Sequence, residues 1–129
     1  MQKPLTSLAI LIATVIALLL AVLVYQNARK DMAPEFTTPY QAVVLVNGQA
    51  FFGRLENINS QYPVLRDVFY IQSQTNPETK QVNVSLVKRG GEWHAPDRMI
   101  LNKQHVLLIE PVKEDSKIAK LIEEQSRKP

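Results

Sequence analysis

The chain contains no cysteine and only two histidines. The lack of cysteine excludes a disulfide scaffold, thiol catalysis and cysteine-ligated zinc or iron–sulfur sites. Glycine is scarce as well, with four residues, and no glycine-rich loop that would hold a phosphate is present. The net charge of +3 is small and the charges alternate in sign, so composition does not indicate a nucleic-acid binder. A chain of 129 residues allows one small globular domain.

The N-terminal part contains a long apolar segment instead. From Leu5 to Tyr25 its only polar side chains are Thr6, Ser7 and Thr14. A helix of about 21 residues spans ~30 Å, the thickness of a bilayer's hydrocarbon core. Because lipid offers no hydrogen bonds to the backbone, such a segment must be helical. Residues 1–28 are therefore predicted to form a short tail and a single transmembrane helix.

A cleaved signal peptide is the competing interpretation. Its apolar stretch is typically ~7–15 residues long and is followed by small residues at the cleavage site. Here the stretch is longer and continues into Arg29, Lys30 and Asp31, which favours an uncleaved anchor. Lys3 and the α-amine on one side nearly balance Arg29 and Lys30 on the other, so the charge rule hardly decides the orientation. We favour a short internal tail with the body exported.

Four alanines lie four residues apart in this segment, at Ala9, Ala13, Ala17 and Ala21. They form one stripe of small side chains, which allows a second helix to approach closely. The stripe is therefore a candidate partner-binding site. The alternative, that alanine is simply common in membrane helices, stays open.

Residues 29–39 contain Pro34 and Pro39 and are predicted to be a semi-rigid spacer. Residues 40–112 then alternate short apolar segments with turn residues, which is typical of strands. Asn47-Gly48 predicts a type I′ turn with positive φ at both residues, and Gly53 marks a bend or a close backbone approach. The expected strands are Tyr40–Val46, Gln49–Ile58, Val64–Gln74, Val82–Arg89, Met99–Leu101 and His105–Glu110.

Many short strands indicate a small barrel or sandwich, and the bent second strand favours a barrel. An inserted hairpin is expected around Gly90-Gly91, with Trp93 near its tip. Residues 113–129 are predicted to form an amphipathic helix, with Asp115 or Ser116 as N-cap. Its narrow apolar stripe is expected to cover one end of the barrel, with contact to a partner as the alternative. The predicted fold class is thus mainly β, with one helix at each end.

The segment Val43–Ile71 resembles the first signature of Sm-like proteins, with an apolar strand, an Asn-Gly turn, Gly53-Arg54-Leu55 and a third apolar strand. Met99–Pro111 is similar to the closing strand pair of that fold, and Thr75–Pro96 would be an enlarged variable loop. The resemblance implies a small Sm/SH3-like β-barrel. The whole layout, including the YQAV-x-L-x-NGQ pattern, also resembles uncharacterised single-pass bacterial membrane proteins, which implies the bacterial inner membrane.

Sm-like proteins that bind RNA carry an Asp and an Asn after the second strand and an Arg-Gly in the closing hairpin. The corresponding positions here are Asn59, Pro63 and Asn102-Lys103. The resemblance therefore implies the fold rather than RNA binding. A membrane-tethered Sm-like oligomer that binds RNA on the cytoplasmic side remains the alternative function, and a homo-oligomer stays possible.

Few residues are candidates for catalysis. His94, Asp97 and His105 could bind a metal in principle, but they lie on different predicted elements without the spacing typical of ligands. No Gly-x-Ser-x-Gly motif is present. We therefore expect no catalytic residue, no metal site and no cofactor.

One segment has a local excess of positive charge near the only tryptophan. This basic hairpin is the second candidate partner-binding site, and a solvated loop is the alternative. If exposed, Trp93 would anchor a contact; the prediction favours burial in the core. Together these features predict a non-catalytic, membrane-anchored accessory subunit whose partners are the lipid bilayer and other membrane protein subunits. The residues of the basic hairpin are Lys80, Lys88, Arg89, Trp93, Arg98 and Lys103.

Overall fold

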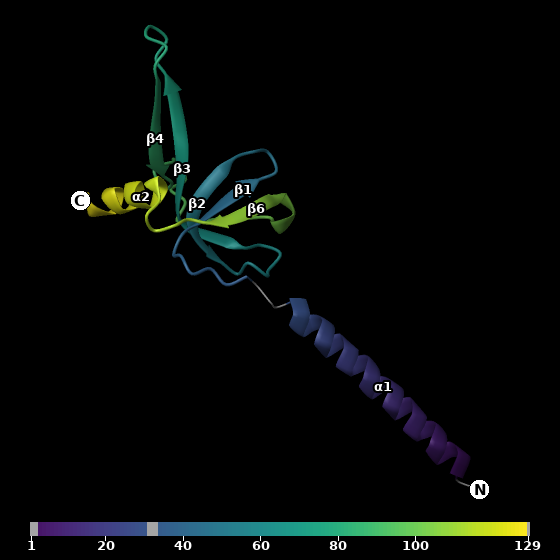
Figure 1. The fold of residues 1–129 in the computed structure, drawn as a ribbon. Coiled ribbons are helices and arrows are strands. Elements are labelled where there is room, and N and C mark those ends of the chain that lie inside the picture. Colours follow the sequence, from purple (N-terminus) through teal and green to yellow (C-terminus); the bar gives the residue numbers. More distant parts are fainter. Residues whose placement is uncertain (1–2, 31–33, 129) are drawn as a thin grey trace. The chain divides into compact units, whose positions relative to one another are not determined.

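The computed structural model describes residues 3–30 and 34–128. The chain divides into two compact units, Met1–Pro34 and Glu35–Pro129, and each is drawn in Figure 1. The predicted C-terminal helix belongs to the same compact unit as the strands. The units are described separately below.

The first unit is the helix α1, Lys3–Lys30, which continues two residues past the predicted end at Ala28. Within it, an 18-residue stretch of the candidate span Lys3–Arg29 has a mean hydropathy of 3.0 and is not buried by protein. The hydroxyl groups of Ser7 and Thr14 donate to main-chain carbonyls four residues earlier, each at 2.8 Å, so the helix itself satisfies them. Helix α1 is thus long and apolar enough to cross a membrane, as a signal sequence also can be.

The second unit is built on a six-stranded antiparallel sheet with the order β4-β3-β2-β1-β6, in which β5 also pairs with β3. Every predicted strand is present, with ends shifted by at most two residues. In hydrogen-bonded order the sheet is open, so the pairing does not show the predicted barrel closure. The strands are β1 Gln41–Leu45, β2 Ala50–Glu56, β3 Val64–Thr75, β4 Val82–Lys88, β5 Arg98–Ile100 and β6 Val106–Pro111; the helical segments are η1 Lys103–His105 and α2 Lys117–Arg127.

Strands β2 and β3 come unusually close at Gly53. A Cβ atom there would lie 2.7 Å from the Arg66 carbonyl oxygen and 2.8 Å from Leu65 Cγ. The register shifts at the same place, because β3 contains an extra residue opposite Gly53, and Asp67 has a φ of 49°. This is a β-bulge that bends the strand pair. The close approach predicted at Gly53 is therefore confirmed.

The turn after β1 differs from the prediction. Gly48 has a φ of 86°, whereas Asn47 is not among the residues with positive φ, so the type I′ turn is wrong. The Gly48 N–H donates to the Leu45 carbonyl at 2.9 Å, and Asn47 Oδ1 accepts from the Gln49 N–H at 3.0 Å. The Asn47 side chain stabilises a three-residue turn in which only the last residue is left-handed.

Side chains from the two faces of the sheet form two separate apolar clusters. Because β-strand side chains alternate, Val68 and Phe69 point to opposite faces, and they belong to different clusters. Buried residues of the inner cluster are Val43, Phe51, Leu65, Val68 and Leu101. Buried residues of the outer cluster are Phe69, Leu86 and Ile122.

Helix α2 closes the outer cluster. Its Ile122 packs with Phe69 and Leu86, so the helix lies on the outer face of β3 and β4 rather than at an end of a barrel. Ser116 Oγ accepts from the Ala119 N–H at 3.1 Å, which confirms Ser116 as the N-cap. The predicted contact between this helix and the sheet is therefore present.

Strands β3 and β4 continue together as a long hairpin, paired from Tyr70–Val87 out to Thr75–Val82. Figure 1 shows this hairpin projecting from the rest of the sheet. The segment after β4 forms no strand around Gly90-Gly91. The prediction of an inserted hairpin there is therefore wrong. Residues 89–97 form an irregular loop instead, which we call the 89–97 loop.

Candidate interaction surface

The 89–97 loop starts and ends beside the bulge of β3. At its start the Arg89 N–H donates to the Val68 carbonyl at 2.7 Å. At its end Arg98 lies directly opposite Arg66 in the β3–β5 register. The loop thus begins beside Val68 and ends beside Arg66, both on β3, which brings its two ends together.

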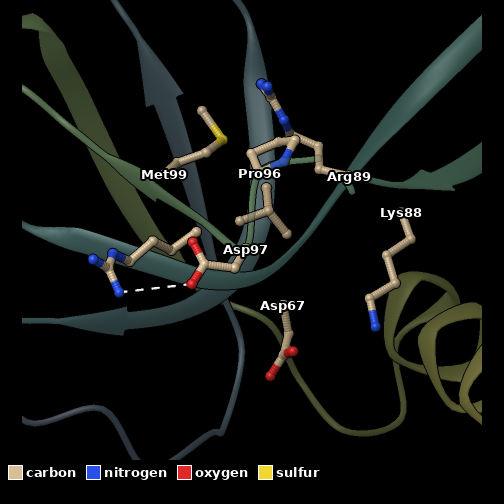
Figure 2. Close-up of a pocket in the computed structure, with 8 residues that line it drawn as sticks. Asp67, Lys88, Arg89, Pro96, Asp97 and Met99 are labelled. Atoms are coloured by element: carbon tan, nitrogen blue, oxygen red, sulfur yellow. Dashed lines mark ion pairs between the residues drawn. The ribbon is translucent and has the colours of Figure 1, made fainter. Parts of the chain in front are cut away.

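A cavity of about 220 Å³ lies between the loop and the bulge. Three of the residues predicted in the basic hairpin, Lys88, Arg89 and Arg98, line it together, as Figure 2 shows for the first two. Lys80 lies in the turn at the tip of the β3–β4 hairpin and Lys103 in η1, so neither lines this cavity. The structure therefore gathers part of the predicted set around the loop rather than on a hairpin.

Carboxylates reduce the positive charge that the sequence segment indicated. Asp97 Oδ2 lies 3.7 Å from Arg98 Nη1, the ion pair dashed in Figure 2. Asp67, which lies far from this segment in the sequence, also lines the cavity, and its Oδ2 is 3.4 Å from Arg54 Nε. The surface around the cavity therefore carries a smaller excess of positive charge than the sequence of the predicted basic hairpin indicates.

Three arginines stand side by side across strands β2, β3 and β5. Arg54 faces Arg66, and Arg66 faces Arg98, an arrangement of like charges that is unfavourable by itself. Glu56 Oε2 accepts a hydrogen bond from Arg66 Nε at 3.0 Å, and this bond raises the pKa of Arg66. Since Asp67 and Asp97 pair with the other two, the row is an ion-pair network on the sheet surface.

Trp93 is fully exposed, with a relative accessibility of 106%, so the predicted burial in the core is wrong. Neighbouring Glu92 is held by the loop: its Oε2 accepts from the Gly90 N–H at 2.8 Å, and its carbonyl accepts from the Ala95 N–H at 2.8 Å. The hydrogen bond from Gly90 is the main reason that the pKa of Glu92 is lowered. Such a free indole is typical of a protein contact anchor.

The four alanines of the first candidate site, Ala9, Ala13, Ala17 and Ala21, all lie on α1 and are exposed. Their spacing of four keeps them on one slowly turning side of the helix. Helix association through this stripe remains a prediction.

The two histidines occupy different elements. His94 lies in the 89–97 loop and His105 in η1. Within residues 3–30 and 34–128, no three histidine or carboxylate side chains gather in a way that could hold a metal ion.

Two of the residues at which the Sm-like resemblance was tested for RNA contacts, Pro63 and Asn102, serve the connection between β5 and β6. Pro63 is fully buried, and its carbonyl accepts from the Leu101 N–H at 2.8 Å. Asn102 Oδ1 caps η1 by accepting from the Gln104 N–H at 3.1 Å. These residues therefore have structural roles, while the third position, Asn59, lies in the turn after β2.

No protein-family model matches the chain, and a search of curated proteins finds no match. Function is therefore inferred from the residues and their geometry.

Proposed function

We propose that this protein is a membrane-anchored, non-catalytic interaction module that serves as an accessory subunit of a larger membrane protein assembly. The exposure of α1 carries this proposal: its aliphatic side chains, such as Leu11 at 63% and Leu18 at 62%, meet no protein. Each such side chain loses about 1.5–3 kcal/mol of favourable burial free energy when it stays in water. A lipid bilayer would remove this cost of exposing apolar side chains to water along the whole helix.

Helix α1 is proposed to be an uncleaved anchor. In support, its apolar stretch exceeds the length typical of a signal peptide and leads into Arg29 and Lys30. We propose that the second unit lies on the extracytoplasmic side of a bacterial inner membrane. Binding of RNA on the cytoplasmic side would require the opposite orientation.

The sheet is proposed to curl into a small Sm/SH3-like barrel. Met99 of β5 and Val106 and Ile109 of β6 pack against the same inner cluster, although β5 and β6 lie at opposite ends of the path β5-β3-β2-β1-β6. The short helix η1 joins the two strands directly. A strongly curved sheet brings both ends to one core in this way.

Contact sites on both units would join the module to its assembly. In the membrane, the alanine stripe would pack against another helix. In the second unit, exposed Trp93 and the neighbouring Lys88 and Arg98 would contact a protein partner.

Purification from membranes in a mild detergent tests the proposal. We expect the tagged full chain to recover the same set of membrane proteins reproducibly, with Trp93→Ala reducing that recovery. Tyr62→Ala is the matched control, because Tyr62 is also an exposed aromatic, at 60%. Recovery of the wild-type chain as a clean monomer would contradict the accessory-subunit proposal.

A reporter fused after Pro129 tests the orientation. Activity outside the cytoplasm is the expected result, because the body is proposed to be exported. Activity confined to the cytoplasm would contradict this placement and bring RNA back as the ligand to test.

A further inference from the structure

A second and larger cavity, of about 490 Å³, lies where the turn between β1 and β2 meets the base of the β3–β4 hairpin. Its walls include the apolar side chains of Phe51, Phe52 and Ile71 together with Tyr70. Arg89 and Glu92 add one charge of each sign. A cavity that combines apolar walls with polar groups is the usual form of a recognition site.

Arg89 has hydrogen-bonding capacity that the fold leaves unused. Its Nε is buried and, within the described residues, has no hydrogen-bond acceptor. It lies 3.3 Å from Glu92 Oε1 as an ion pair, and the guanidinium carbon is 5.9 Å from the centre of the Phe51 ring. A guanidinium group has five N–H donors and binds a carboxylate with two parallel hydrogen bonds. Because Glu92 pairs at the buried Nε, a carboxylate from outside is complementary to the terminal nitrogens Nη1 and Nη2.

A strand edge becomes free beside the same cavity. The β2–β3 register ends at the pair Phe52–Phe69, whereas β3 continues to Thr75 with β4 as its partner. In the described chain, β3 from Tyr70 onward is thus paired along one edge only. Extended peptides bind such edges by adding a strand.

We propose that this cavity is the docking site for an extended segment of a partner protein that carries an aspartate or glutamate next to an apolar side chain. The carboxylate pairs with Arg89, the apolar side chain packs against Phe51 and Tyr70, and the backbone adds to the free edge of β3. Trp93, one residue from Glu92 in the chain, is fully exposed and would add a contact to the same partner. The inference rests on the proposed function and specifies the chemistry of the partner.

Peptide binding to the full chain in lipid nanodiscs tests the inference. The probe is the acetylated, amidated peptide Val-Phe-Glu-Val-Thr, and the matched peptide carries glutamine in place of glutamate. We expect the glutamate peptide to bind roughly tenfold more tightly, since a charge-assisted pair replaces a neutral contact. Shifts of the Arg89 Nε–H resonance and of the Trp93 indole resonance should report the binding.

Two variants separate Arg89 from general positive charge. Arg89→Gln should abolish the preference for the glutamate peptide, and Arg89→Lys should keep a smaller preference, because lysine retains the charge without the two parallel donors. The matched control is Lys113→Gln, which removes an exposed cation that lines neither cavity. This control should keep the full preference. The variants are compared only where their amide spectra match that of the wild-type chain.

Equal affinity for the two peptides would overturn the inference, and so would equal losses in Arg89→Gln and Lys113→Gln. Benzoate binding as tight as peptide binding would also overturn it, because a small acid needs no strand edge. A peptide methylated on alternate backbone nitrogens should bind more weakly, and undiminished binding would contradict strand addition. Failure of peptide binding leaves recovery of membrane partners intact, whereas failure of the proposed function removes that recovery.

Discussion

The two units of the chain use the same aliphatic residues in opposite ways. In α1 the leucines, isoleucines and valines are exposed from end to end, with Leu5 at 72% and Val24 at 69%. In the second unit Val43 and Leu65 are completely buried. The difference lies in the pattern: α1 is apolar on every side, whereas the strands alternate, which lets them bury one face and expose the other.

Exposure therefore has a different meaning in each unit. For α1 it indicates an apolar surrounding, because water would penalise the whole surface. For single side chains of the second unit, such as Val46 and Leu107, exposure to water is ordinary. Variants that place the same chemical change in both units can separate the two meanings.

The largest effect is expected from charges in the middle of α1. The double variant Ile16→Asp, Leu20→Asp should raise the free energy of membrane insertion by about 5–7 kcal/mol, because each central charge costs about 2.5–3.5 kcal/mol. Membrane fractionation should find the variant outside the bilayer. Val46→Asp, on a side chain that is 59% exposed, should remain membrane-bound and change unfolding by less than about 0.5 kcal/mol.

Truncation of a core side chain should have the next largest effect. Leu65→Ala should destabilise the second unit by about 2–5 kcal/mol, because it leaves a cavity in the inner cluster. Circular dichroism of the full chain in detergent should show the sheet melting earlier while the signal of α1 persists. Leu107→Ala, at a residue 63% exposed, is the control and should melt with the wild type; joint melting of α1 and the sheet would contradict two independent units.

Adding a methyl group tests the difference between the crowded backbone at Gly53 and the open backbone at Gly91. Gly53→Ala should destabilise the sheet by about 1–3 kcal/mol, because the new Cβ would overlap the Arg66 carbonyl. Gly91→Ala is the matched change at a glycine with no atom within 4 Å of the new Cβ. Urea unfolding should find it neutral or slightly stabilised, and equal effects of the two variants would contradict the close approach of β2 and β3.

A smaller effect is expected at the start of α2, which depends on the Ser116 cap. Ser116→Ala should cost about 1 kcal/mol, because the Ala119 N–H loses its acceptor. Ser116→Asp supplies another acceptor and should restore most of the stability in thermal unfolding. If alanine and aspartate behave alike, the cap contributes nothing to the helix.

The smallest effect is local and depends on pH. Because the pKa of Glu92 is lowered from 4.5, its ionised form stabilises the 89–97 loop at pH values above 4.5. That contribution is lost as the pH falls through the lower pKa of the folded state. The Gly90 amide proton resonance should therefore shift with a midpoint below 4.5. Glu92→Gln should remove the titration, and a wild-type midpoint at or above 4.5 would contradict the hydrogen bond from Gly90.

Local sequence patterns were sufficient to predict most of the fold. Alternation and turn residues fixed the strand positions to within two residues, and a glycine in mid-strand was a sound sign of close approach. The Asn47-Gly48 turn was predicted with the wrong geometry, because the Asn47 side chain binds the Gln49 amide. Such a side-chain hydrogen bond competes with the backbone preference that the dipeptide alone suggests.

The candidate surface could be predicted only in part, because it depends on contacts between distant residues. Asp67 lowers the charge near Arg98, yet it becomes a neighbour only through the β3 bulge. Trp93 was expected in the core on residue type, whereas a loop fixed by Glu92 leaves it exposed. The cavity beside Arg89 depends on where the β2–β3 pairing stops, and no local pattern marks that point.

The central claim is that α1 stays in the chain and resides in lipid. The most direct measurement combines alkaline carbonate washing of membranes with the intact mass of the recovered protein. We predict that the 129-residue chain stays in the membrane pellet with its N-terminal helix attached. A shorter product lacking the helix, or the whole chain in the aqueous fraction, would contradict the account.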